Sequence, residues 1–223
     1  MQVDHCEFPE NLYYDIENDV WFQTDVGGNR ARMGISTILS FVAGRVLKVK
    51  LNLELKQVEV GKKVGTIESA VYFGAVRSPV VGNIARMNLG LQQDPRPLDE
   101  SPYGAGWIAE YDSFDNSSLA RLCYGEIARE KLEARIKELK VKCFKLLPDD
   151  QMYSIGTECI TTLVNLSELL SKRPLGSVVH LVTDDPLSDV EMVRWAMRTK
   201  NEVVETRKED NLYHFIVKKT AEK

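Results

Sequence analysis

The 223-residue chain lacks the features that mark several large classes of protein. No apolar run approaches the ~20 residues that a membrane-spanning helix needs, and residues 1–10 are polar and acidic, unlike a signal peptide. The formal net charge of -4 gives no bulk preference for nucleic acid or for an anionic membrane. With 43% hydrophobic and 28% charged residues, the composition is that of a globular protein. We therefore expect a cytoplasmic protein that binds neither nucleic acid nor membrane.

Cysteine and histidine are both scarce. The four cysteines lie far apart in sequence and form no Cys-x-x-Cys pair; they are Cys6, Cys123, Cys143 and Cys159. The histidines are scattered as well. Zinc sites usually use such pairs together with histidines, so we predict no metal site, although Cys6 beside His5 leaves a weak alternative. Isolated cysteines are mostly buried apolar residues. We expect Cys123 and Cys143 to be structural residues of this kind.

Catalytic motifs are missing as well. The chain has no Gly-x-Gly-x-x-Gly after a strand, no P-loop, no inferable Ser-His-Asp order and no convincing pair of catalytic carboxylates. Asp184 and Asp185, which precede Pro186, fit a helix cap better than acid–base chemistry. No stand-alone enzyme is therefore predicted.

The first half of the chain predicts an all-β fold. Short β-branched or alternating segments at residues 20–24, 30–34, 45–53 and 66–71 are separated by glycines, which is typical of a barrel or sandwich. Residues 119–142 then carry apolar side chains at helical spacing and charged side chains between them, so they predict a connecting amphipathic helix.

The rest of the chain alternates strand and helix patterns in the order β-α-β-α-β-β. The strands and helices are expected at residues 152–155, 160–172, 177–183, 190–199, 202–207 and 212–218. This order indicates a two-layer α+β sandwich with one sheet covered by two helices. We therefore divide the chain into a barrel at residues 1–116, a helix and linker at 117–150, and a C-terminal domain at 151–223.

Three segments of the first half resemble the lipoyl barrel of glycine cleavage H proteins. Residues 68–72 read Glu-Ser-Ala-Val-Tyr and are followed in register by Ser-Pro-Val-Val-Gly at 78–82, while residues 102–107 read Pro-Tyr-Gly-Ala-Gly-Trp. In that family the hairpin reads Glu-Ser-Val-Lys-Ala, and its lysine carries lipoate. The resemblance covers residues 13–116 and implies a lipoyl-type barrel sandwich.

The resemblance fails at the residue that would carry the cofactor. Val71 stands where the family has the lipoylated lysine, and a valine side chain has no amine, so we expect no lipoate and no other cofactor. Modification of Lys62 or Lys63 would require a ligase that accepts a different hairpin. Tyr72 and Phe73 at the predicted tip either form a contact surface for a partner or fold back onto the barrel.

The C-terminal domain resembles the small TusA-type (SirA-like) sulfur carriers. Residues 156–162 read Gly-Thr-Glu-Cys-Ile-Thr-Thr, where that family has Gly-x-x-Cys-Pro-x-Pro, and Asp-Asp-Pro follows the next strand in both. The resemblance implies that Cys159 carries a persulfide at the start of a helix, where the helix dipole favours the thiolate. Ile160 and Thr162 replace both prolines, and Glu158 opposes the thiolate.

Two hypotheses of different classes follow. In the first, the protein relays sulfur on Cys159, and the barrel docks partners of sulfur transfer or lipoyl-type enzymes, because H proteins are held by several partner enzymes. In the second, both carrier sites have decayed and the protein is a non-catalytic scaffold or regulator. Lipoate carriage on Lys62 or Lys63 is a third and weaker alternative. The first hypothesis requires Cys159 to be partly exposed at the start of a helix, with Val71 at a hairpin tip.

Overall fold

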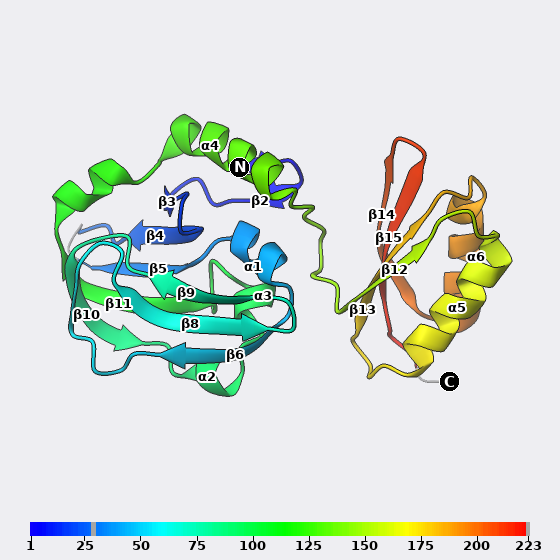
Figure 1. The fold of residues 1–223 in the computed structure, drawn as a ribbon, viewed down its shortest axis with the longest axis horizontal. Coiled ribbons are helices and arrows are strands. Elements are labelled where there is room, and N and C mark those ends of the chain that lie inside the picture. The colour runs from blue at the N-terminus through cyan, green and yellow to red at the C-terminus, as the bar shows by residue number, and fades with distance from the viewer. Residues whose placement is uncertain (28–29, 222–223) are drawn as a thin grey trace. The chain divides into compact units, whose positions relative to one another are not determined.

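The computed structural model describes residues 1–27 and 30–221 (Figure 1). The chain divides into two compact units, Met1–Cys143 and Phe144–Lys223, and each is described by itself. Among the described residues, no helix is both long enough and apolar enough to cross a membrane.

The first unit consists mostly of short strands. They are β1 (Gln2–Val3), β2 (Cys6–Glu7), β3 (Tyr13–Asp15), β4 (Val20–Thr24), β5 (Ala31–Ile35), β6 (Val46–Leu51), β7 (Gln57–Val58), β8 (Lys63–Ser69), β9 (Phe73–Arg77), β10 (Gly82–Met87) and β11 (Trp107–Phe114). The helices are α1 (Thr37–Ala43), α2 (Gly90–Gln93), α3 (Pro97–Glu100), a 3-10 helix (Asn116–Arg121) and α4 (Gly125–Leu139).

Two antiparallel sheets enclose the main core of this unit. One sheet has the strand order β3-β4-β5-β11-β10-β7, and the other has the order β6-β8-β9. Phe22 and Met33 of the larger sheet and Ile67 of the smaller one are fully buried in the same apolar cluster. Buried side chains of both sheets therefore meet in one core, as in a sandwich whose inner faces pack together. The predicted β-rich first half is therefore confirmed.

Helix α4 packs onto this sandwich (Figure 1). Its buried residues Ala128, Leu132 and Ile136 join a second apolar cluster that includes Trp21. Residues 117–150 therefore do not form a part of their own: α4 belongs to the first unit, and the chain from Phe144 onward belongs to the second.

A disulfide joins Cys6 of β2 to Cys143, which follows α4. The expectation that the cysteines are isolated apolar residues is wrong for Cys6 and Cys143. The β1–β2 hairpin packs beside α4 in the second apolar cluster, and this packing places together two cysteines that lie 137 residues apart in sequence. No local pattern signals a pairing at such a separation. Cys123 is free and buried, as expected.

The second unit has the predicted order of elements. They are β12 (Asp150–Ser154), α5 (Cys159–Ser171), β13 (Val178–Thr183), α6 (Ser188–Thr199), β14 (Glu202–Glu209) and β15 (Leu212–Lys218). The strands form one sheet in the order β12-β13-β15-β14, in which β12 and β13 are parallel. Leu166 of α5 and Trp195 of α6 pack with Leu181 and Phe215 of the sheet. The two helices therefore cover the same face of this sheet, as Figure 1 shows.

The opposite face of this sheet carries a pair of buried histidines. The ring nitrogens His180 Nε2 and His214 Nδ1 lie 2.9 Å apart. The Phe144 ring packs against His180 in a tilted arrangement with 4.5 Å between the ring centroids, and the Arg207 guanidinium lies over Phe144. The first residue of the second unit therefore covers part of this face.

Candidate functional site

Val71 lies at the tip of the hairpin between β8 and β9, as predicted, and 81% of it is exposed. The tip is held by Ser69, whose Oγ accepts hydrogen bonds from the backbone amides of Val71, at 3.1 Å, and Tyr72, at 3.0 Å. The same hydroxyl donates to the carbonyl oxygen of Ala43, at the end of α1, over 2.5 Å. One serine thus fixes the shape of the turn and attaches it to the body of the unit.

Tyr72 and Phe73 point in different directions. Phe73 is 73% exposed, whereas Tyr72 folds back and packs against the main core. A Cβ atom at Gly74 would lie 2.1 Å from the Tyr72 hydroxyl oxygen, so glycine is required there for the ring to fold back. Burial, and to a lesser extent the nearby charge of Asp19, raise the pKa of Tyr72. Of the two residues predicted to form a contact surface, Phe73 is available to a partner, whereas Tyr72 is packed against the core.

The exposed end of the three-stranded sheet carries a further apolar residue that the sequence analysis missed. Leu47 is 64% exposed, because the register of β6 against β8 shifts between Val46 and Lys48. Beside it, Glu68 of β8 is paired with Lys48 on one side and with Phe73 on the other. We call Leu47, Val71 and Phe73 the tip patch.

Lys62 and Lys63 lie at the other end of β8 from this patch. Lys63 is the first residue of the strand and Ser69 the last, so at about 3.3 Å per residue roughly 20 Å of strand separates the two ends. Lys62 precedes the strand in a turn, in which the Gly61 amide donates to the Ser78 carbonyl oxygen at 2.8 Å. Neither amine is near the position of Val71.

Cys159 is the first residue of α5, as expected, but only 8% of it is exposed. The expected partial exposure is therefore wrong. Burial raises the pKa of the Cys159 thiol, and the carboxylates of Asp185 and Glu191 raise it further. The group at this helix start is thus a covered thiol whose surroundings disfavour the thiolate, contrary to what the helix dipole predicted.

Asp185 acts as a helix cap, as predicted for the Asp184-Asp185 pair, whereas Asp184 accepts a hydrogen bond from the loop before α5. Asp185 accepts hydrogen bonds from the amide of Cys159 at 2.9 Å and from the amide of Leu187 at 2.8 Å, so it serves the starts of both α5 and α6. Asp184 accepts from the amide of Gly156 at 2.8 Å. The carboxylate that caps the Cys159 amide is therefore also the one that disfavours its thiolate.

We expect Asp185→Asn to make Cys159 more reactive. Asparagine keeps a carbonyl oxygen for the amide of Cys159 but removes the negative charge that raises the pKa of the thiol. The alkylation rate of Cys159 should rise severalfold near pH 8, and its pH profile should move to lower pH. Peptide mapping distinguishes Cys159 from Cys123. Burial, Asp185 and Glu191 raise the pKa of Cys159, rather than Glu158 as the sequence suggested. The matched control is therefore Glu158→Gln, which removes an exposed neighbouring charge and should leave the profile in place. An unchanged profile in Asp185→Asn would contradict the assignment.

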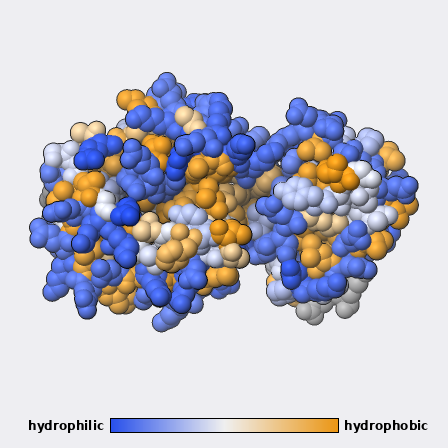
Figure 2. Space-filling model, in the orientation of Figure 1, coloured by the Kyte–Doolittle hydropathy of each residue, from blue (hydrophilic) through white to orange (hydrophobic). Residues whose placement is uncertain are grey.

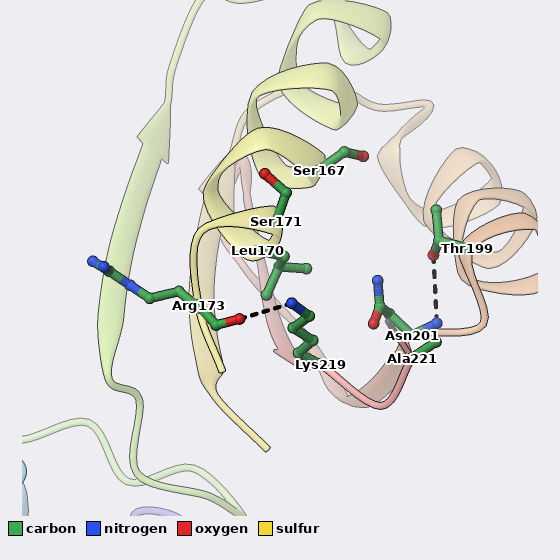
Figure 3. Close-up of a pocket in the computed structure, with 8 residues that line it drawn as sticks. All are labelled: Ser167, Leu170, Ser171, Arg173, Thr199, Asn201, Lys219 and Ala221. Atoms are coloured by element: carbon green, nitrogen blue, oxygen red, sulfur yellow. Dashed lines mark hydrogen bonds between the residues drawn. The ribbon is translucent and has the colours of Figure 1, made fainter. Parts of the chain in front are cut away.

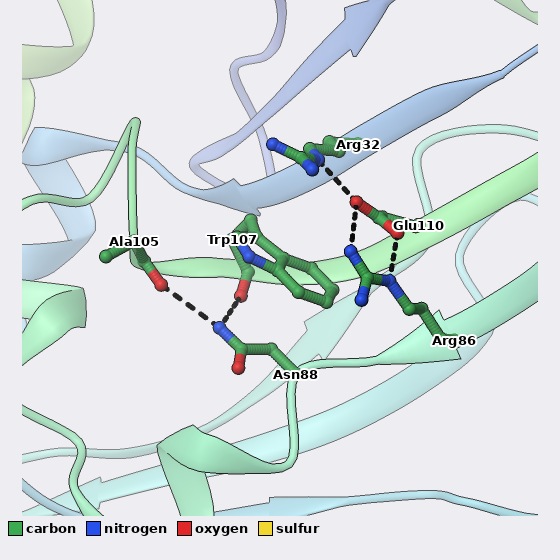
Figure 4. A network of polar contacts seen from close by, with 6 residues as sticks. All are labelled: Arg32, Arg86, Asn88, Ala105, Trp107 and Glu110. Atoms are coloured by element: carbon green, nitrogen blue, oxygen red, sulfur yellow. Dashed lines mark hydrogen bonds and ion pairs between the residues drawn. The ribbon is translucent and has the colours of Figure 1, made fainter.

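A polar network that no motif predicted surrounds Trp107 (Figure 4). Glu110 accepts hydrogen bonds from Arg32 at 2.5 Å and from Arg86, and both guanidinium groups lie over the Trp107 ring, at 5.6 Å and 5.0 Å from its centre. Hydrogen bonds from Arg86 and then Arg32 hold the pKa of Glu110 below its ordinary value. The network joins β5, β10 and β11, and we assign it a structural role.

The second unit has an open hollow of about 410 Å³ at the ends of α5 and α6 (Figure 3). The Lys219 amine donates to the carbonyl oxygen of Arg173 at 2.7 Å, and the Arg173 guanidinium pairs instead with Asp150. These contacts attach the segment after β15 to the end of α5 and the start of β12. In the part of the chain that the structure describes, no group of three or more His, Cys, Asp or Glu side chains is arranged to hold a metal ion.

Comparison with known proteins identifies the family of the first unit. The model of the family "Glycine cleavage H-protein" matches residues 12–135, which is more than half of the chain, so the protein belongs to the glycine cleavage H-protein family. It is 35% identical to "Probable glycine cleavage system H protein 2" of Sulfolobus acidocaldarius, over 64% of this chain and 96% of that protein. It is 34% identical to "Glycine cleavage system H protein 2" of Aquifex aeolicus, over 62% of this chain and 86% of that one.

A solved structure is also similar to part of the chain. The glycine cleavage system H protein of Mycobacterium marinum is 24% identical, with a TM-score of 0.44, over 51% of this chain and 96% of that one. The family match ends at residue 135. It therefore does not extend to the second unit or to Cys159.

Proposed function

We propose that this protein is an H-protein family member that carries no lipoate and acts by binding the enzymes that receive H-protein hairpins. The observation that carries the proposal is the tip patch: an exposed hairpin of the kind on which H proteins present their cofactor ends in Val71 and Phe73 instead of an amine. The second hypothesis, a non-catalytic scaffold or regulator, fits this arrangement.

The hairpin has the properties of a docking element. Ser69 fixes its turn through three hydrogen bonds, so little conformational freedom would be lost on binding. Exposed apolar side chains at one end of a sheet are typical of a contact surface, and aromatic residues such as Phe73 are enriched in the buried centre of interfaces. A pocket that admits a lipoyl-bearing hairpin would accept this one without reacting with it.

The persulfide-carrier hypothesis for Cys159 has less support. Attack on a donor persulfide requires an accessible thiolate, whereas Cys159 is covered and its surroundings raise the pKa of the thiol. Detection of an added sulfur atom on Cys159 in protein from its native source, together with loss of that mass in Cys159→Ala, would restore this hypothesis.

A competition assay tests the docking proposal. The purified protein should inhibit the reaction of an enzyme that acts on lipoylated H protein of the same organism. Phe73→Glu places a charge in the tip patch and should raise the concentration needed for half-inhibition by about tenfold or more, the effect of losing roughly 1.4 kcal/mol of binding.

The matched control is Ile127→Glu on α4, because Ile127 is 61% exposed and lies outside the tip patch. It should inhibit as the unchanged protein does. Equal inhibition by both variants, or no inhibition by the unchanged protein, would contradict the proposal.

A further inference from the structure

The outer face of the sheet β6-β8-β9 is basic. Its basic residues are Lys48 and Lys50 of β6, Lys63 of β8 and Arg77 of β9. Each is exposed and adjoins a buried valine of its own strand, and successive side chains of a strand point to opposite faces. All four side chains therefore point away from the core. We call them the basic face, and Glu68 is the only acidic residue in these three strands.

The fold of the unit does not favour this arrangement. Lys63 is paired directly with Arg77 on the neighbouring strand, and like charges directly opposite each other destabilise a sheet. In the part of the chain that the structure describes, no carboxylate lies within ion-pair distance of Lys48, Lys50 or Lys63. Arg77 donates to the carbonyl oxygen of Gly61 at 2.9 Å. A negatively charged ligand would relieve the repulsion within the basic face.

The charges of the first unit are also segregated. Residues 45–86 contain eight basic and three acidic residues, whereas the rest of Met1–Cys143 contains ten basic and 17 acidic ones. The sheet β6-β8-β9 lies toward the viewer in Figure 1, and Figure 2, in the same orientation, shows hydrophilic side chains, in blue, around paler ones on this side of the unit. The acidic surroundings would repel an extended polyanion such as RNA. The ligand that fits the basic face is therefore a local acidic patch on a protein.

The basic face is continuous with the tip patch. Glu68 is paired with Lys48 on one side and with Phe73 on the other, so these three side chains form one row across the sheet. A partner that covers Phe73 therefore meets Lys48 and Lys50 next. We infer that the basic face binds an acidic rim beside the pocket that receives the hairpin. This inference rests on the docking proposed for the tip patch and adds the charge of the partner's surface.

The competition assay tests this inference when it is run at about 50 mM and at about 500 mM salt, because salt screens exposed charges. At the lower salt concentration, Lys48→Glu/Lys50→Glu should raise the concentration needed for half-inhibition by about tenfold. At the higher salt concentration this difference should shrink. The matched control is Arg129→Glu/Lys131→Glu on α4, which changes the net charge equally at two other exposed residues. It should inhibit as the unchanged protein does.

Lys63→Glu separates binding from folding. It replaces the repulsive pair with Arg77 by an attractive one, so the first unit should melt at a slightly higher temperature while the protein inhibits more weakly. General damage to the fold would lower the melting temperature as well as the inhibition. A variant that melts higher and inhibits as strongly as the unchanged protein would count against the inference.

The outcomes distinguish this inference from the docking proposal. No inhibition by the unchanged protein at either salt concentration would overturn the docking proposal and this inference with it. Loss of inhibition in Phe73→Glu but not in Lys48→Glu/Lys50→Glu would leave the docking proposal standing and overturn this inference alone. Binding of the unchanged protein, but not of the lysine variant, to a single-stranded RNA or to vesicles that contain phosphatidylserine would assign the basic face to a polyanion and overturn the inference as well.

Discussion

Val71→Lys is expected to make this protein a substrate for lipoylation, whereas the unchanged protein gains no lipoyl group. Position 71 is at the hairpin tip and 81% exposed, so a lysine there can extend into solvent without disturbing the core. Glu68 and Ser69 are already present, and Ser69 already fixes the turn. The substitution therefore supplies the missing amine on an existing support.

Mass spectrometry after incubation with lipoate, ATP and a lipoate ligase measures the result. The variant should gain one lipoyl group at position 71, and the unchanged protein should gain none on Lys62 or Lys63. Phe73→Lys is the matched control, because Phe73 is 73% exposed and only two residues away. Equal modification of both variants would show that position does not matter, and modification of Lys62 or Lys63 in the unchanged protein would favour the lipoate-carrier alternative.

The sequence predicted the regular elements of both units because their periodicity is local. The strand Val20–Thr24 is found at the predicted residues, and the second unit follows the predicted order with boundaries that differ by a few residues. Helix α1 was missed since its seven residues, Thr37–Ala43, are rich in residues that also suit strands. Tertiary packing decides the conformation of such a short segment.

The candidate site shows where local reasoning stops. The spacing of the two strands is enough to predict that Val71 lies at a hairpin tip. The direction of the Tyr72 side chain could not be predicted in this way, because its ring lies where a Cβ atom at position 74 would be. The helix start at Cys159 was predicted correctly. However, Asp185 lies 26 residues away in sequence, and its carboxylate accepts a hydrogen bond from the Cys159 amide. The charge of this carboxylate also raises the pKa of the Cys159 thiol. Sequence predicts the place of a residue better than the surroundings that set its chemistry.

The disulfide bears on the expected cytoplasmic location. Disulfides persist where thiols are oxidised and are rare in the cytosol of mesophiles, although intracellular proteins of hyperthermophiles contain them. The Cys6–Cys143 pair fits either of these settings, and the cytoplasmic location stays a prediction.

Removal of the Cys6–Cys143 disulfide is expected to lower the free energy of unfolding of the first unit by about 2–5 kcal/mol. The bond joins residues 137 positions apart. In the unfolded state it therefore closes a loop that contains the residues of both sheets. In the folded state it links the β1–β2 hairpin to the end of α4, whose buried residues share one apolar cluster with Val3 and Phe8.

The double variant Cys6→Ser/Cys143→Ser measures this effect without leaving a single reactive thiol. Calorimetry should show the melting temperature of the first unit lowered by roughly 10 °C, and addition of a reductant to the unchanged protein should lower it similarly. Cys123→Ser is the control, because Cys123 is buried but free; reductant should have no effect on the double variant. If the unchanged protein, with both cysteines shown to be reduced, melts as before, then the packing of α4 holds the hairpin without the covalent bond.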